Sequence, residues 1–231
     1  MQFSLSSEAT IHVDPIGEER QPLCVIDNAL PDPDAFVDHA ATKPFGQIGA
    51  YYPGVRATLD TDCGASLCET VGTIARENFA MRHEAWGGEY FFSIVTTPPA
   101  QLAPIQRLPH YDGVETDRLA VLLYLTPEPQ GGTSFYRHRA TGFETIDKSR
   151  FPEYKSALEN DVRSHGLPPA HYIDDGAPLF ERIKTVDAVY NRMLVYRGIN
   201  LHCSAIDETT SFSPDPRVGR LTINAFLTPA S

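Results

Sequence analysis

Hydrophobic positions in the second half of the chain follow the two-residue period of β-strands. Residues 220–228 (RLTINAFLT) alternate, so Leu221 and Ile223 are expected on one face, and Arg220 and Thr222 on the other. Residues 119–125 (LAVLLYL) are apolar throughout, which is typical of a strand buried on both faces. We expect further strands at 89–96, at 133–137, and at 184–189 and 192–196, the last two as a pair joined at Tyr190 and Asn191.

Three segments carry helix signals instead. Asp32 followed by Pro33 predicts the start of a short helix. Ser66 followed by Glu69 is a capping-box pattern and predicts that a longer helix opens there. Both helices are expected to pack on the outside of a sheet. A third helix is expected over 151–165, where Pro152 stands near the start and Gly166 follows the end.

Many short strands separated by turns favour a jelly-roll or barrel-like β architecture. We expect a single domain over 1–231, mainly β with flanking helices (α+β), in which 1–88 supports a core at 89–228. A helical insertion near 140–182 interrupts the core. It is longer than ordinary connections, so a lid, a substrate-binding loop and a merely decorative insertion all stay open.

Composition excludes several classes of partner. The net charge is −11 and the pI is near 5.1, which disfavours nucleic acid and anionic membranes because both need a surplus of basic residues. The start of the chain lacks a basic stretch followed by an apolar run, so no secretory signal is expected. The 4 cysteines form no CxxC pair. We therefore expect a cytoplasmic protein with free thiols that acts on a small-molecule or peptidyl substrate.

The candidate chemistry centres on His110-Tyr111-Asp112. Residues two apart on an extended strand share a face, so His110 and Asp112 can present an imidazole and a carboxylate to one ion. His202, after the apolar run 193–196, is the candidate for a third ligand. Two histidines and one carboxylate form the facial triad of non-haem Fe(II) sites. Taken alone, the HxD pair is a weak signal, more typical of a strand end whose side chains form hydrogen bonds with the following turn.

The order of motifs around this pair resembles the prolyl 4-hydroxylase-like branch of the Fe(II)/2-oxoglutarate-dependent dioxygenases. That pattern has HxD, an apolar strand ending in Tyr-Leu, a GG-x-T-x-F-like turn, a distal His, and a basic residue opening the last strand. This chain shows, in the same order, His110-Tyr111-Asp112, Tyr124-Leu125, Gly131-Gly132-Thr133-Ser134-Phe135, His202 and Arg220.

The resemblance implies a double-stranded β-helix (cupin-like jelly roll) core and the cofactors Fe(II) and 2-oxoglutarate. It implies that His110, Asp112 and His202 bind the metal, and that Arg220 pairs with the distal carboxylate of 2-oxoglutarate. The expected reaction is hydroxylation of a substrate with release of succinate and CO₂. The chain departs from the pattern in two ways. The gap of 18 residues from His202 to Arg220 is longer than is usual in this branch, and the acidic residue that many relatives carry after the Gly pair is missing.

Several assignments stay open at the level of sequence. Tyr124 and Thr222 are candidates to line the 2-oxoglutarate site beside Arg220, and Arg217 is the rival arginine. His138, between two arginines, is expected in a solvated basic patch. Two other functions compete: a metal hydrolase that uses the same three ligands with Zn²⁺, and a binding module of the same fold that has lost turnover.

Overall fold

The structure is a computed structural model that describes residues 1–128, 130–176, 178–207 and 210–230. Its elements, in chain order, are β1 (Thr10–Ile16), β2 (Gln21–Asp27), α1 (Pro33–Ala40), β3 (Gly54–Thr58), α2 (Thr61–Asn78), β4 (Trp86–Val95), the 3₁₀ turns η1 (Pro99–Gln101) and η2 (Pro104–Arg107), β5 (Leu119–Tyr124), β6 (Gly132–His138), α3 (Phe151–His165), β7 (Phe180–Asp187), β8 (Met193–Arg197), β9 (His202–Ala205) and β10 (Leu221–Pro229).

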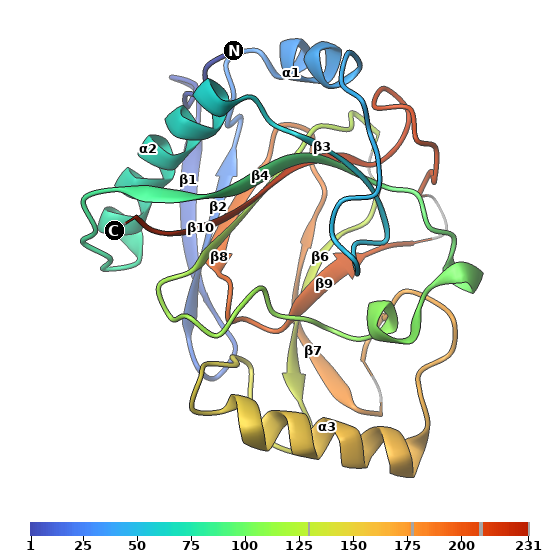
Figure 1. The fold of residues 1–231 in the computed structure, drawn as a ribbon. Coiled ribbons are helices and arrows are strands. Elements are labelled where there is room, and N and C mark those ends of the chain that lie inside the picture. The colour runs from blue at the N-terminus through green and yellow to red at the C-terminus, as the bar shows by residue number, and fades with distance from the viewer. Residues whose placement is uncertain (129, 177, 208–209, 231) are drawn as a thin grey trace.

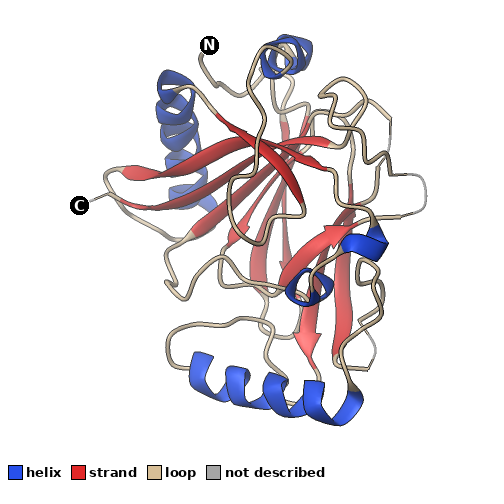
Figure 2. Cartoon of the chain, turned by 45° about the vertical axis from the view of Figure 1, so that its right-hand side comes forward, coloured by secondary structure: helices blue, strands red, loops and turns tan. Residues whose placement is uncertain are grey.

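The strands form two antiparallel sheets (Figure 1). The large sheet has the order β1-β2-β8-β5-β10-β4-β3, and the small sheet has the order β7-β6-β9. Figure 2 shows α1 and α2 beside the large sheet and α3 beyond the small one. The predicted class, mainly β with flanking helices, is confirmed.

Side chains of the large sheet alternate between two cores. Leu221 and Ile223 of β10 lie in the cluster that joins this sheet to α1 and α2. The opposite face carries Thr222, which pairs in register with Tyr124 of β5. Tyr124 in turn packs with Phe135 of the small sheet in the cluster between the sheets. The face alternation predicted for 220–228 is therefore confirmed.

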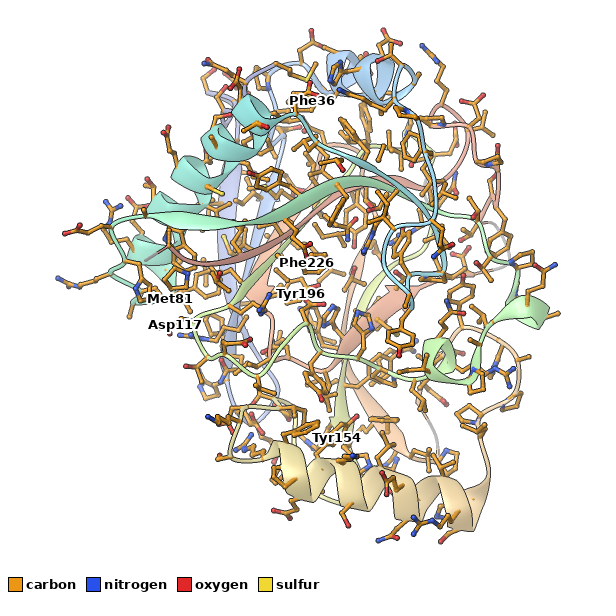
Figure 3. All side chains as sticks on the ribbon, in the orientation of Figure 1. Phe36, Met81, Asp117, Tyr154, Tyr196 and Phe226 are labelled. Atoms are coloured by element: carbon orange, nitrogen blue, oxygen red, sulfur yellow. The ribbon has the colours of Figure 1, made fainter. Side chains whose placement is uncertain are left out.

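The outer face of the small sheet packs against α3. Figure 3 shows Tyr154 on the side of α3 that faces the strands, and its ring centroid lies 5.1 Å from that of His138. His138 is fully buried, with Nδ1 3.0 Å from the Thr141 hydroxyl and Nε2 3.0 Å from a carboxylate oxygen of Asp161. The prediction of a solvated patch at His138 is wrong, because α3 covers the strand face to which this residue points.

The helices α1 and α3 begin where the sequence predicts, whereas α2 begins earlier. The Asp32 carboxylate accepts the N–H of Ala35 at 3.1 Å, which confirms the predicted start of α1. The predicted opening of α2 at Ser66 is wrong, since the helix begins at Thr61. The Ser66 hydroxyl donates to the Asp62 carbonyl inside the helix and accepts the N–H of Phe3. α3 spans 151–165 as predicted.

The strands β7 and β8 are neighbours in sequence but do not pair. β7 pairs with β6 in the small sheet, whereas β8 lies between β2 and β5 in the large one. The chain changes sheet at Asn191, whose φ is +61° and whose side-chain amide bonds both the N–H and the carbonyl of Leu30. The predicted hairpin is therefore wrong. Asparagine tolerates this left-handed conformation better than most residues.

A buried carboxylate fastens the β1–β2 turn to the rest of the fold. Glu144 is 4% exposed and accepts the N–H groups of Glu18 and Glu19, both at 3.0 Å. Arg137 donates to the same carboxylate at 2.9 and 2.6 Å. The Glu144 carbonyl accepts the N–H of Leu201, next to His202. This cluster therefore connects the N-terminal hairpin to the strand that carries a candidate ligand.

Within the described ranges, no helix combines the length and the apolar character that crossing a membrane requires. The four cysteines are free and buried, as expected.

We expect Glu144→Ala to lower the free energy of unfolding by about 3 kcal/mol, because it leaves the half-buried Arg137 and two backbone N–H groups without their acceptor. Glu181→Ala is the matched control, since Glu181 contacts the same arginine at 3.4 Å with its side chain 45% exposed. Its loss should stay below about 1 kcal/mol. Urea unfolding measures both, and equal losses would contradict the role given to Glu144.

Candidate metal centre

The three predicted ligands come together from two separate segments of the chain. His110 lies in the loop after η2, and His202 opens β9. Their backbones form an isolated antiparallel bridge, in which each N–H donates to the other carbonyl at 2.9 and 2.8 Å. The N–H of Asp112 donates to the Gly198 carbonyl at 2.7 Å. These bonds fix the HxD segment along the edge of the small sheet.

The ligand atoms are spaced for a single ion. The Asp112 carboxylate oxygens lie 3.8 Å from His110 Nε2 and 3.6 Å from His202 Nε2. One ligand atom from each of the three residues lies within 4.8 Å of the others. Bonds of about 2.1 Å to a common ion place neighbouring ligand atoms about 3 Å apart, so small side-chain adjustments suffice.

The donor chemistry also fits a cation. Asp112 Oδ2 is buried and has no hydrogen-bond partner within the described ranges, which is costly unless a positive group faces it. His202 Nδ1 donates to the Asn200 carbonyl at 2.9 Å. The proton is then on Nδ1, and Nε2 presents its lone pair toward Asp112.

Burial sets the protonation of the site. Desolvation lowers the pKa of His202 to about 4, so its ring is neutral at physiological pH, which is the form that binds metals. Desolvation raises the pKa of Asp112 to about 6. The pKa of His110 shifts downward too, through desolvation and the neighbouring His202, although 54% of its side chain is exposed.

Aromatic side chains enclose the inner side of the cluster. The Tyr196 ring lies edge-on to His202, with centroids 4.9 Å apart, and also contacts Phe135 at 5.0 Å. Figure 3 shows Tyr196 on β8 near the middle of the molecule. The triad therefore has an apolar wall on the side of the large sheet, and His110 is its most exposed member.

Arg220 is buried, and its hydrogen-bond partners in the described ranges are uncharged. It is 2% exposed, and its guanidinium donates to the carbonyls of Gln130 and Gly132 at 2.9 and 2.8 Å. Among the described residues it forms no ion pair. Its Cζ lies 5.5 Å from the centroid of the Tyr124 ring. Two carbonyls leave part of the charge uncompensated, since a buried cation is ordinarily paired with an anion.

The remaining predicted residues surround Arg220 with their polar groups already bonded. The Tyr124 hydroxyl lies 2.7 Å from that of Thr133, and Thr222 donates to the Asn224 side chain at 2.7 Å. The rival Arg217 is more than half exposed and pairs with Asp38 at 2.9 Å. The structure therefore distinguishes the two arginines by environment: one is buried with uncharged partners and the other is a surface ion pair.

Two polar residues near the site were missed at the level of sequence. Asn200 is 2% exposed, and neither the nitrogen nor the oxygen of its side-chain amide has a hydrogen-bond partner among the residues described. Arg56 of β3 lies on the same face of the large sheet as Thr222. The only available signals were an asparagine near the distal histidine and an arginine inside a short β-like run, and neither is specific.

These features define a protein of two facing β-sheets with a His-Asp-His cluster able to hold a metal ion. The model of DUF6445, described as a family of unknown function, matches residues 7–227. The chain belongs to this family. No curated protein sequence matches it.

Solved structures give distant matches. HygX from Streptomyces hygroscopicus, with nickel and 2-oxoglutarate bound, is 10% identical, with a TM-score of 0.48, and the match covers 92% of this chain and 84% of that chain. The α-ketoglutarate-dependent epimerase SnoN from nogalamycin biosynthesis is 13% identical, with a TM-score of 0.48 and coverage of 92% and 79%. An N-substituted L-amino acid dioxygenase from Burkholderia ambifaria is 13% identical, with a TM-score of 0.41 and coverage of 98% and 95%. Likenesses of this size assign no activity.

We expect Asp112→Asn to weaken the binding of Co²⁺ or Ni²⁺ by more than about 100-fold, because even the loss of a group that only orients a ligand costs 10–100-fold. Asp117→Asn is the control: this aspartate follows in the same loop, its side chain is 47% exposed, and it pairs with His83 (Figure 3). Calorimetric titration measures both affinities. Similar affinities for the two variants would remove Asp112 from the metal site.

Proposed function

We propose that this protein is a non-haem Fe(II)- and 2-oxoglutarate-dependent oxygenase. The observation that carries the proposal is the pairing of a two-histidine, one-carboxylate cluster with a buried arginine that has no carboxylate partner among the described residues. The first feature suits a divalent cation with open coordination positions, and the second suits an anionic co-substrate.

His110, Asp112 and His202 would hold the iron. Three protein ligands leave positions free for a co-substrate and for O₂. Iron in such a site supplies O₂ activation coupled to the conversion of 2-oxoglutarate to succinate and CO₂, and with it the hydroxylation of a substrate C–H bond. The Asn200 carbonyl holds the His202 ring in the tautomer that can bind the metal, and the rings of Tyr196 and Phe135 keep water from its inner side.

Arg220 would bind the distal carboxylate of 2-oxoglutarate. Its planar fork can bond both oxygens of a carboxylate, and burial strengthens the attraction because little water screens it. The carbonyls of Gln130 and Gly132 orient the guanidinium before the ligand arrives. Tyr124 and Thr222 line the same face of the sheet and would form the wall beside the co-substrate.

The strand order supports a finer assignment of the fold. The chain passes repeatedly between the sheets: β4, β5, β8 and β10 lie in the large one, while the bridge segment at His110, the consecutive strands β6 and β7, and β9 lie in or along the small one. Eight such strands in two sheets correspond to a jelly roll, here in its double-stranded β-helix form. The motif order from His110 to Arg220 further favours the prolyl 4-hydroxylase-like branch.

Arg220 also weighs against the competing functions. A zinc hydrolase needs only the three ligands and a water, so it gives no reason to keep an arginine buried without a carboxylate. A binding module without turnover would retain the affinity for metal and 2-oxoglutarate but form no succinate. Metal identity and succinate formation therefore separate the three candidates.

The direct test is an anaerobic titration of the protein with Fe(II) and 2-oxoglutarate. We expect a metal-to-ligand charge-transfer band that needs both components, and succinate formation when O₂ is admitted. His110→Ala and His202→Ala should abolish iron retention, the band and turnover. Zinc retention in wild type without any 2-oxoglutarate binding would instead support the hydrolase.

Arg220→Met should raise the Kd of 2-oxoglutarate by about 30-fold or more, because truncating one partner of a buried charge pair costs about 2–5 kcal/mol. Metal affinity should stay unchanged, and circular dichroism checks the fold. Arg217→Met removes an exposed arginine of the same region and should leave the Kd within about twofold. Unchanged 2-oxoglutarate affinity in Arg220→Met would exclude the assignment.

A further inference from the structure

A second arginine, which has no charged partner in the described part of the chain, lies on the sheet face that carries the proposed co-substrate site. Arg56 is in the middle of β3, where it pairs in register with Ser93 of β4, and Ser93 pairs with Thr222 of β10. The three side chains therefore form one row across the large sheet on the same face. Tyr124 continues this row on β5.

Aromatic rings surround the Arg56 guanidinium. Its Cζ lies 4.0 Å from the ring centroid of Tyr52, 5.2 Å from that of Phe91 and 5.6 Å from that of Phe226. Figure 3 shows Phe226 on β10, over the middle of the sheet. Gly49 (φ +84°) brings the preceding loop so close that a Cβ there would lie 3.1 Å from an Arg56 guanidinium nitrogen.

The structure shows no acceptor for the N–H groups of this guanidinium within the part of the chain that it describes. Among the described residues its side chain makes no hydrogen bond and no ion pair, and Nε is buried without a partner. Other arginines that are not fully exposed differ: Arg107 and Arg197 donate to backbone carbonyls, and Arg192 pairs with Asp27. Arg56 is thus an unusual cation for its degree of burial.

Ring contacts alone do not satisfy this side chain. A cation–π contact uses the flat face of the guanidinium, whereas its five N–H donors point outward in the plane. Rings packed on the guanidinium hold that plane fixed and leave its edge free to bond the two oxygens of a carboxylate. The arrangement therefore orients the donors for a planar anion.

The row of side chains beside Arg56 leads to the proposed metal site. Phe226, which contacts Arg56, pairs in register with Ala120 of β5, and Ala120 pairs with Tyr196 of β8, whose ring contacts that of His202. Part of this face is exposed: Phe226 and Asn224 are partly exposed, whereas Ala225 between them, on the face that packs against α2, is fully buried.

We propose that Arg56 binds a carboxylate of the prime substrate, with an adjoining apolar group of that substrate against Phe91 and Phe226. This inference rests on the proposed oxygenase function and deepens it. It narrows the substrate class to carboxylic acids with an apolar or aromatic portion, bound next to the metal and separately from the co-substrate at Arg220.

The test compares an acid with its uncharged amide. The full-length protein, saturated with Zn²⁺ and 2-oxoglutarate to give a redox-inert complex, is titrated with 3-phenylpropionate and with 3-phenylpropanamide, and ligand-observed NMR measures the two affinities. In wild type the acid should bind at least about tenfold more tightly, because a charge-assisted hydrogen bond contributes about 1.5–3 kcal/mol.

Arg56→Met keeps the apolar stem and removes the charge. We expect it to lower the affinity for the acid by about tenfold or more, and to leave the amide affinity and the 2-oxoglutarate Kd within about twofold. Arg56→Lys keeps the charge but lacks the planar fork, so its affinity for the acid should lie between those of wild type and Arg56→Met. Arg76→Met, an exposed site on α2, is the matched control and should change neither affinity.

Equal binding of acid and amide to wild type, or unchanged acid affinity in Arg56→Met, would overturn the inference. So would a loss of 2-oxoglutarate affinity in Arg56→Met, because Arg56 would then serve the co-substrate. A wild-type protein that binds neither Fe(II) nor 2-oxoglutarate would refute the oxygenase proposal instead. The acid and amide titrations, repeated on metal-free protein, would still show whether Arg56 selects carboxylates.

Discussion

The backbone bridge between His110 and His202 is the constraint on which the candidate site depends. Two reciprocal hydrogen bonds hold the HxD segment against β9, and a third, from Asp112 to Gly198, fixes its direction. Since the rings project from paired backbones, their centroids lie only 4.4 Å apart. The HxD segment lies in a loop, and its backbone bonds to β9 and to Gly198 place its side chains.

Charge is distributed unevenly between the surface and the interior. The chain carries a net charge of −11, yet Arg56 and Arg220 lie on the inner face of the large sheet without an ion pair among the described residues. A cationic interior within an acidic protein favours small anions that can enter it and disfavours large polyanions, which the outer surface repels. This separation fits small anionic ligands held on the inner face of the large sheet.

Local patterns were enough to predict what depends on local geometry. The alternation at 220–228 put Arg220 and Thr222 on one face, and the spacing of His110 and Asp112 placed two ligands together. Features that depend on contacts between distant segments were not accessible. Ser66 bonds its own helix instead of capping it, His138 is covered by α3, and β7 and β8 belong to different sheets. The environment of Arg56 could not be predicted either, because the rings around its guanidinium come from separate segments of the chain.

The N-terminal hairpin has a consequence for the solubility of the protein. β1 ends the large sheet, and it contains Pro15, which lacks an N–H, beside the polar Asp14. Such an edge resists the addition of a further strand from another molecule. If the hairpin of β1 and β2 detached, the apolar strand β8 (MLVYR) would become the new edge of the sheet. Its backbone N–H and C=O groups on that side would then be unpaired along a hydrophobic sequence. The first thirty residues thus shield the sheet from intermolecular β-pairing, and a protein shortened at this end would be prone to aggregate.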